Sequence, residues 1–217
     1  MPLLVVGGST LKWKTSVVYL GSKIAEDGNT VCAIKHRICC AETVVKRLNN
    51  RVFSRRLVSD KLKGQFVESA VFSSLLYGLE HFAIGIRDRR CLDGYFLRLA
   101  KRIMHMRFDY HLSYAEAEER LGVVRPSLRL AKERLRWVGH VLRSEDSVLR
   151  EVIHFVPTGG ARGRERPRRR YYDTVKQDIV ERNIAIATKD QTRFWNELPI
   201  VVAERDLWGS TVVEWGR

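Results

Sequence analysis

Nine consecutive residues, Leu-Arg-Trp-Val-Gly-His-Val-Leu-Arg at positions 135–143, set the pattern on which the fold depends. Apolar residues around them recur at alternating steps of three and four, as on one face of a helix: Leu128, Ala131, Leu135, Val138 and Leu142. Basic side chains recur in the same way on the opposite face: Arg129, Lys132, Arg136, His140 and Arg143. Pro126 followed by Ser127 suits a helix start. We therefore predict a helix from Ser127 to Arg143 with one buried face and one cationic face.

A glycine-punctuated loop, which begins at Thr158-Gly159-Gly160, and an arginine run come next. The run is interrupted by one acid, Glu165, and comprises Arg162, Arg164, Arg166, Arg168, Arg169 and Arg170. We interpret it as a phosphate clamp, because arginine forks bind phosphate oxygens in pairs and a nearby helix start adds donors. A solvated basic loop or a nuclear-import-like run is the alternative.

These two segments resemble the region downstream of the catalytic palm in reverse transcriptases of non-LTR retrotransposons. The first match comprises Leu135, Arg136, Trp137, Gly139, His140, Val141 and Arg143, and the second comprises Arg166, Pro167, Arg170 and Asp173. Glu165 stands where the family has glycine, and Tyr171 stands where it has tryptophan.

The resemblance covers most of the chain, from about Tyr19 to Trp195. Tyr19-Leu20-Gly21-Ser22 resembles the hairpin that closes the family's palm near the primer end, although Val17-Val18 replaces the usual phenylalanine-lysine. An ordinary hairpin whose aromatic residue packs on the next helix is the alternative. The resemblance implies that three helices after the hairpin form a polymerase thumb, which grips the template-primer duplex.

Three helices are expected before residue 112. The first, from Thr30 to Asn49, has an apolar seam of Val31, Ile34, Ile38, Ala41, Val45 and Leu48. The second starts at a Ser59-Asp60 cap, and its apolar face runs through Leu62, Phe66, Ala70 and Ser73 towards Leu76. The third, after Asp88, has Leu92, Phe96, Leu99, Ile103 and Met106 on one face and Arg98, Lys101, Arg102 and His105 on the other.

Shorter helices are expected in the second half of the chain. Their predicted positions are Tyr114 to Leu121 after a Ser113 cap, Ser147 to Phe155, a segment from near Pro167 with Tyr171, Val175, Ile179 and Val180 on its apolar stripe, and Asp190 to Glu197. The predicted fold class is therefore mainly α. It comprises a short β-hairpin in residues 1–29, a thumb-like three-helix bundle in 30–112 and a smaller basic helical unit in 113–217.

The charge of the chain indicates its class of partner. Lysines and arginines number 39 against 25 acids, a formal net charge of +14. Such an excess favours a polyanion, most commonly nucleic acid, whereas a merely basic soluble protein is the alternative. The predicted nucleic-acid-binding residues are Arg98, Lys101, Arg102, Arg129, Lys132, Arg136, Arg143, Arg162, Arg164, Arg166, Arg168, Arg169 and Arg170. We expect them to contact phosphates of RNA, DNA or a hybrid duplex, largely without reading sequence.

The sequence has no residue set typical of polymerase catalysis. Two catalytic metal ions need paired aspartates, and the chain has no Asp-Asp pair. In the family those carboxylates precede the Tyr-Leu-Gly hairpin. We therefore predict no catalytic residues, no cofactor, and neither polymerase nor hydrolytic activity from this chain alone.

Cys32, His36 and Cys39 (or Cys40) lie at helical steps of four and three, so their side chains share one side of a helix. Structural zinc sites usually have four ligands, and the chain has no Cys-x-x-Cys pair, so we predict packed thiols and no metal. We also predict that Gly139 permits close helix packing and that His140 bonds a neighbour. Trp137 is expected to pack in the core, with base stacking as the alternative.

Reduced cysteines without a secretory signal predict an intracellular protein, in the nucleus or the cytoplasm. The longest apolar run is broken by Glu80 and His81, so no membrane span is expected. Besides nucleic acid, the family's palm domain is a candidate partner. A different class of function is a domesticated helical interaction protein whose basic faces bind acidic proteins.

Overall fold

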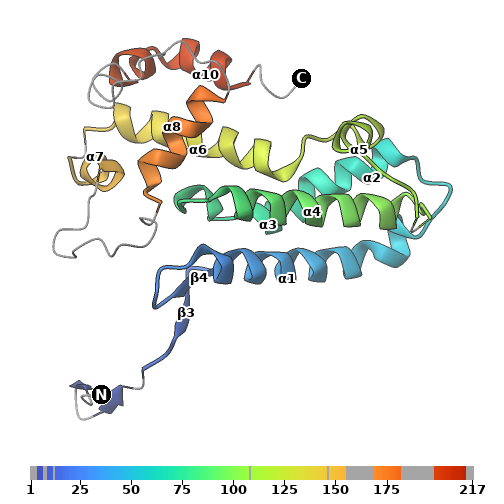
Figure 1. Cartoon of the computed structure of the whole chain (residues 1–217), viewed down its shortest axis with the longest axis horizontal. Coiled ribbons are helices and arrows are strands. Elements are labelled where there is room, and N and C mark those ends of the chain that lie inside the picture. The colour runs from blue at the N-terminus through green and yellow to red at the C-terminus, as the bar shows by residue number, and fades with distance from the viewer. Residues whose placement is uncertain are drawn as a thin grey trace.

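Three tiers of helices follow two small hairpins in the computed structural model, which describes residues 4–6, 9–11, 13–107, 109–145, 147–154, 169–181 and 198–213 (Figure 1). The helix α1 forms one outer tier, α2 to α4 form the middle tier, and α6 lies beyond them with α8 and α10 (Figure 1). The chain is therefore mainly helical with a short β-hairpin near its N-terminal end, as the sequence predicts.

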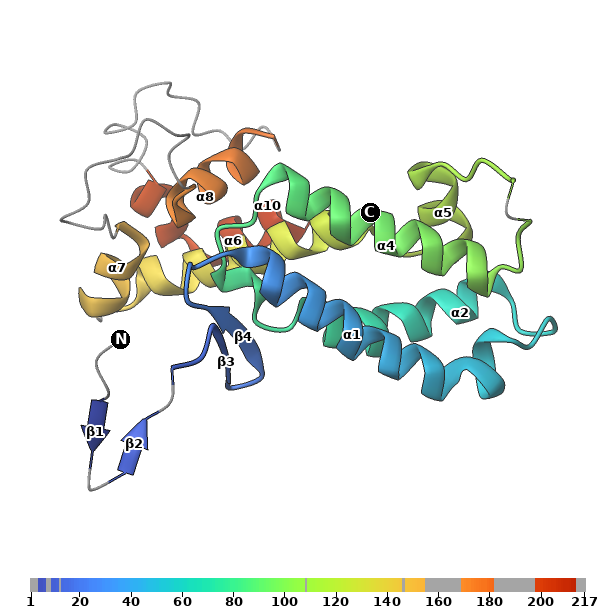
Figure 2. The same ribbon diagram turned by 60° about the horizontal axis from the view of Figure 1, so that its bottom comes forward.

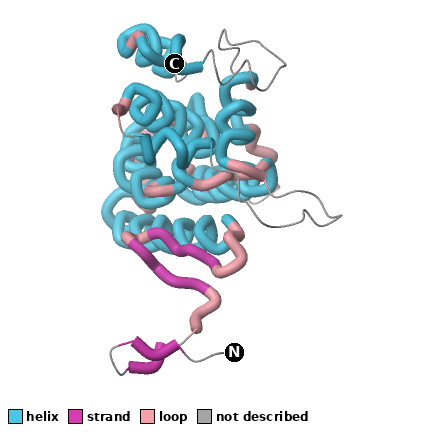
Figure 3. The backbone as a smooth tube through the Cα atoms, turned by 90° about the vertical axis from the view of Figure 1, so that its left-hand side faces the viewer, coloured by secondary structure: helices cyan, strands magenta, loops and turns pink. Residues whose placement is uncertain are grey.

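Both hairpins lie at one end of the molecule (Figure 3). Strand β1 (Leu4–Val6) pairs with β2 (Ser9–Leu11), and β3 (Ser16–Tyr19) pairs with β4 (Ser22–Ala25), both antiparallel. Leu20 and Gly21 both have positive φ, which is typical of a tight two-residue hairpin turn. The β3–β4 hairpin was predicted, whereas β1–β2 was not. Tyr19 is 64% exposed, which disfavours the alternative in which its ring packs on the next helix.

Helix α1 spans Thr30–Leu48 and continues as a π-helical segment, η1 (Asn49–Phe53). It begins where the Asn29 side chain accepts a hydrogen bond from the Val31 N–H at 2.9 Å. Val31 itself is exposed, contrary to the predicted seam, whereas Arg37 is buried. The Arg37 guanidinium donates to the Gly21 carbonyl and lies 4.8 Å from the ring centre of Tyr77. Arg37 of α1 therefore connects the β3–β4 hairpin to the end of α3.

The second predicted helix is a continuous rod of three parts: α2 (Asp60–Phe66), the π-helical η2 (Val67–Phe72) and α3 (Ser73–Leu76). Ser59 caps it, as predicted, by accepting from the Leu62 N–H at 3.3 Å. The predicted apolar face is only partly right: Phe66 and Leu76 pack in the core, but Leu62 is 43% exposed and the buried side runs through Lys63, Val67 and Val71. Lys63 is buried because its Nζ donates to the Ile103 carbonyl at 2.8 Å.

Helix α4 (Ile86–Ile103) runs beside α1 in the same direction (Figure 2). Two contacts define this parallel register: Thr30 Oγ1 donates to Asp88 Oδ2 at 2.8 Å, and Arg102 donates to Glu42 at 3.0 Å. The predicted buried residues Leu92, Phe96, Leu99 and Ile103 all lie in the core. A short 3-10 turn, η3 (Leu79–His81), leads from α3 towards α4.

Helices α5 (Tyr114–Leu121) and α6 (Pro126–Arg143) match their predicted bounds closely. Ser113 caps α5 by accepting from Glu116 N–H at 3.1 Å. The start of α6 is capped from α4, because Asp93 accepts from the N–H and the Oγ of Ser127, at 3.0 and 2.7 Å. Leu128 is 36% exposed, so the predicted apolar face of α6 is wrong at this position.

The remaining described helices are α7 (Ser147–His154), α8 (Tyr171–Val180), a segment at 198–203 and α10 (Arg205–Val213). Val175 and Ile179 are buried as predicted, but Val180 is 58% exposed. The helix predicted at 190–197 lies outside the described residues. The segment at 198–203 and α10 were not predicted, and α10 supplies the buried Trp208.

Two hydrophobic clusters divide the molecule, one from Ala33 to Leu130 and one from Leu135 to Val212. Helix α6 contributes to both, so the division falls inside this helix. The predicted boundary at residue 112 lies before α5, whose Ala117 and Leu121 belong to the first cluster. Among the described helices, none is long and apolar enough to cross a bilayer.

Candidate nucleic-acid interface

The parallel pair α1 and α4 presents a cationic surface, which we call the α1–α4 face. Glu42 of α1 contacts Arg102 of α4, so the helical rows that contain these two residues lie side by side. The basic members of the face are Lys35 and Lys46 on α1 and Arg98, Lys101 and Arg102 on α4. The three α4 residues were predicted to bind nucleic acid, whereas Lys35 and Lys46 were missed because their contribution depends on how α1 packs.

The acids of α1 and α4 neutralise little of this face, although Glu26 and Asp27 line the same hollow as Lys35. Helices α1 and α4 contain three acids, and two of them are engaged elsewhere. Asp88 accepts from Gly85 N–H and from Thr30, and Asp93 caps α6. Glu42 alone lies on the face among the acids of these two helices.

Glu42 is held as a carboxylate by its neighbours. Burial by itself would raise its pKa, but the hydrogen bonds and charge of Arg102, with the charge of Lys46, outweigh burial and lower the pKa. The adjacent Tyr95 is 4% exposed, and burial together with the Glu42 charge raises its pKa. The face therefore has one fixed anion surrounded by several cations.

The predicted basic row of α6 forms a ridge, and its residues have different environments. Arg129 pairs with Glu68 at 3.1 Å, and Arg136 pairs with Glu133 on its own helix at 3.1 Å. Burial lowers the pKa of Lys132, and the charge of Arg136 lowers it further. The guanidinium of Arg143 donates to the Val202 carbonyl at 3.0 Å, so Arg143 also holds the C-terminal segment against α6.

The arginine run is only partly within the described residues, since Arg162, Arg164, Arg166 and Arg168 lie outside them. Arg169 precedes α8, and its side chain extends along that helix, where it donates to Thr174 Oγ1 at 2.9 Å and to Gln177. Burial, followed by the charge of Arg89, lowers its pKa. Arg170 donates to the Tyr172 hydroxyl at 2.8 Å. Both arginines therefore support the start of α8, a role the sequence did not indicate.

In the segment at 135–143, Gly139 and Trp137 make specific packing contacts with other helices. A Cβ on Gly139 would lie 2.3 Å from Nε1 of Trp208, whose N–H donates to the Leu135 carbonyl at 3.1 Å. Gly139 thus permits close packing, as predicted, with α10 as the partner. Trp137 is half-buried, and its ring meets His81 and Tyr171 edge to face, at centroid distances of 4.9 and 5.6 Å. His140 is exposed on the ridge.

A buried ion cluster joins the two halves of the molecule and was missed from the sequence. Asp178 of α8 is fully buried and pairs with Arg134 of α6 and, at 2.6 Å, with Arg89 of α4. Arg134 is 1% exposed. Sequence patterns usually assign arginine to the surface, so they give no signal for a buried arginine such as Arg134.

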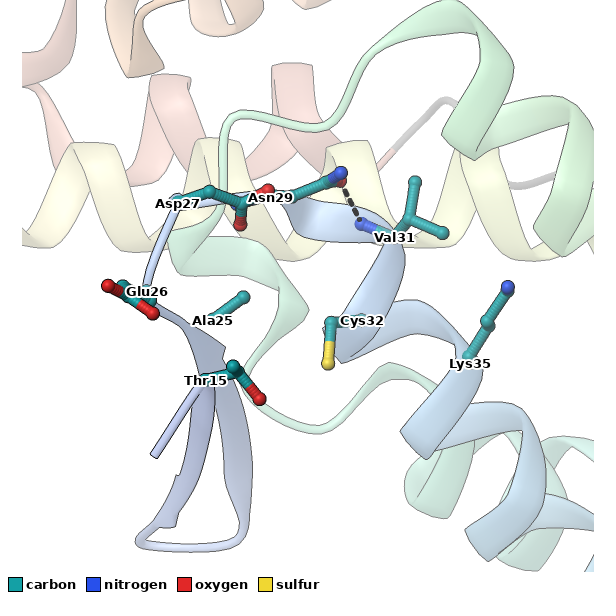
Figure 4. Close-up of a pocket in the computed structure, with 8 residues that line it drawn as sticks. All are labelled: Thr15, Ala25, Glu26, Asp27, Asn29, Val31, Cys32 and Lys35. Carbon is teal, nitrogen blue, oxygen red and sulfur yellow. Dashed lines mark hydrogen bonds between the residues drawn. The ribbon is translucent and has the colours of Figure 1, made fainter. Parts of the chain in front are cut away.

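The cysteines do not assemble a metal site within the described residues, where no three His, Cys, Asp or Glu side chains come together suitably. Cys40 Sγ lies 3.8 Å from His36 Nε2, whereas Cys39 is exposed. Cys32 lines a shallow hollow between the β3–β4 hairpin and the start of α1, opposite Thr15 (Figure 4). The Asn29 cap forms one side of this hollow (Figure 4).

Comparisons with protein-family models, with curated proteins and with solved structures find no match to this chain.

Proposed function

We propose that this chain is a nucleic-acid-binding helical module that holds the phosphate backbone of RNA, DNA or a hybrid duplex. In origin it would be the thumb and downstream region of a retrotransposon-type reverse transcriptase, in line with the sequence resemblance. Binding would be independent of base sequence, because contacts to phosphates carry no base information.

The α1–α4 face carries this proposal. Lysine and arginine side chains from two parallel helices lie on one side, with Glu42 as the one acid that the two helices place among them. Side chains of a polyanion-binding surface must be accessible, and Lys35, Lys46 and Arg98 are all exposed. Two rows of cationic side chains on the adjacent helices α1 and α4 match the linear array of phosphates along a nucleic-acid strand. Each contact with a phosphate would release a condensed counterion.

The test is fluorescence anisotropy with labelled duplexes of unrelated sequence over a range of salt concentrations. The wild-type protein should bind them with similar affinities and a steep salt dependence. Arg98→Gln should reduce the slope of log affinity against log salt by about 0.9 on duplex DNA, the value for one lost phosphate contact. Arg150→Gln is the matched control, because Arg150 is also an exposed arginine but lies on α7.

Two results would count against the proposal. Failure of the wild-type protein to bind any nucleic acid at low salt would refute it outright. An acidic peptide that binds as tightly as duplex, with the same loss in Arg98→Gln, would favour an acidic protein as the partner instead.

A further inference from the structure

Two surface grooves adjoin along the ridge of α6. The first, the α3–α6 groove, lies between the end of α3 with η3 on one side and α6 on the other, with Phe72 and Leu76 among its lining residues. The second, the α6–α10 groove, is lined by Arg143 of α6 and Arg205 of α10. Both are lined by Arg136 and His140, which therefore form the ridge between them.

The α3–α6 groove has aromatic walls with accessible surface. Tyr77 is 57% exposed, and the side chain of His81 is 47% exposed. Trp137 supports His81 from behind in an edge-to-face contact at 4.9 Å. The Arg37 guanidinium lies over the Tyr77 ring at 4.8 Å, so the orientation of this exposed ring is fixed before any ligand arrives.

This wall is also held rigidly relative to α6 and α8. Trp137 packs edge to face on Tyr171 of α8, and the Tyr171 hydroxyl donates to the Glu80 carbonyl at 3.0 Å. Burial raises the pKa of Tyr171, so this hydroxyl stays protonated and remains a donor. A preorganised aromatic surface binds without a further entropic cost of ordering side chains.

The charges near the ridge favour an anion. The acids that line the α3–α6 groove, Glu80 and Glu133, lie beside His81 and Arg136 respectively. The Arg136–Glu133 pair is exposed on both sides, and such pairs contribute little stability, so Arg136 can exchange Glu133 for a phosphate at small cost. Beyond it, Arg143 and Arg205 extend the cationic lining into the second groove, where Asp206 is the acid.

We propose that these grooves form one binding path for single-stranded nucleic acid, with bases on Tyr77 and His81 and phosphates along Arg136, His140 and Arg205. This inference rests on the proposed function and specifies a second site with a different substrate class. Base faces in a duplex are covered by neighbouring pairs, whereas unpaired bases expose them for stacking on aromatic rings. The α1–α4 face, which lacks such exposed rings on its cationic rows, would hold duplex.

The experiment measures anisotropy of labelled oligothymidylate, oligouridylate and a hairpin duplex of equal length. Loss of one stacked base typically weakens binding by about fivefold or more. We therefore expect Tyr77→Ala to bind single strands at least about fivefold more weakly, with little change for duplex. Tyr77→Phe keeps the ring and should bind normally. Tyr110→Ala is the matched control, since Tyr110 is 44% exposed and lies in a different pocket.

Circular dichroism and thermal melting establish that each variant is folded. If Tyr77→Ala melts early, His81→Ala tests the same wall, with the same expected loss for single strands. Equal losses for single strand and duplex, or no loss in either variant, would overturn the inference. Wild-type protein that binds duplex but not single strands would refute this site and leave the proposed function standing. Absence of binding to both would refute the proposed function itself.

Discussion

At the scale of single residues, Gly139 has no room for a side chain. Its missing side chain is the space that the Trp208 indole occupies, and the Trp208 N–H uses that position to bond a carbonyl of α6. Glycine in the interior of a helix normally costs stability relative to alanine, so its presence here needs a packing reason. The packing of α10 on α6 provides that reason.

Gly139→Ala should therefore destabilise the protein by about 1–3 kcal/mol, the usual cost of overpacking a well-filled interface. Gly209→Ala is the control, because a Cβ at Gly209 in α10 would meet no atom within 4 Å. That change should leave stability unchanged or raise it by about 0.5–1 kcal/mol. Urea denaturation followed by circular dichroism measures both. Equal effects at the two glycines would show that α10 does not pack on α6 in this way.

At the scale of elements, helix ends were more predictable from the sequence than helix faces. Ser59 and Ser113 cap their helices through a hydrogen bond three residues away, so the signal is local. Faces depend on distant partners. Lys63 is buried because the carbonyl of Ile103 accepts from it, and Arg134 is buried because Asp178 lies opposite. A sequence pattern that places every charged side chain in solvent therefore predicts the wrong environment for both residues.

The candidate sites divide in the same way. The cationic rows of α4 and α6 are periodic within one helix, and the sequence indicates them directly. The aromatic wall combines Tyr77 and His81 with Trp137, which is more than 50 residues away along the chain. The contribution of Lys35 and Lys46 likewise follows from the register between α1 and α4. Tertiary packing alone brings such residues together.

The contact between α1 and α4 makes a prediction about pH. The unfolded pKa of Glu42 is about 4.5 and the folded value is lower, so the native state binds fewer protons between the two values. The stabilisation from Glu42 is thus complete above 4.5 and is lost as pH falls through the folded pKa. A double-mutant cycle of Glu42→Gln and Arg102→Gln should show a small coupling near pH 7, on the order of 1 kcal/mol or less. The coupling should vanish in acid; persistence at about pH 2 would contradict the contact.

At the scale of the whole molecule, Asp178 links the two hydrophobic clusters. It receives Arg89 from the first half and Arg134 from the shared helix α6. A buried pair adds little net stability compared with an apolar substitute, but removal of one partner leaves the other charges buried and uncompensated. Asp178 therefore compensates two buried or half-buried arginines at once, one from each side of the boundary between the clusters.

Asp178→Asn should cost about 3–5 kcal/mol in unfolding free energy, measured by urea denaturation. Glu181→Gln offers the control, because Glu181 pairs with the same Arg89 at 2.8 Å but its side chain is 47% exposed. That variant should lose about 1 kcal/mol or less. Hydrogen exchange in Asp178→Asn should rise first in α8 and in the second half of α6. A uniform rise across α1 and α4 as well would mean that the two clusters unfold as one unit.

The parallel arrangement of α1 and α4 also has an electrical consequence for the fold. Their peptide dipoles point the same way, so the negative ends of two macrodipoles add at one end of the bundle. That end carries Lys46 and Arg47 on α1, Lys101 and Arg102 on α4, and the buried Lys63 ammonium on the last turn of α4. Cations there offset the dipoles whether or not a polyanion is bound. Neutralising them would change folding and binding together, whereas Lys35 and Arg98, which lie nearer the middle of their helices, report on binding more directly.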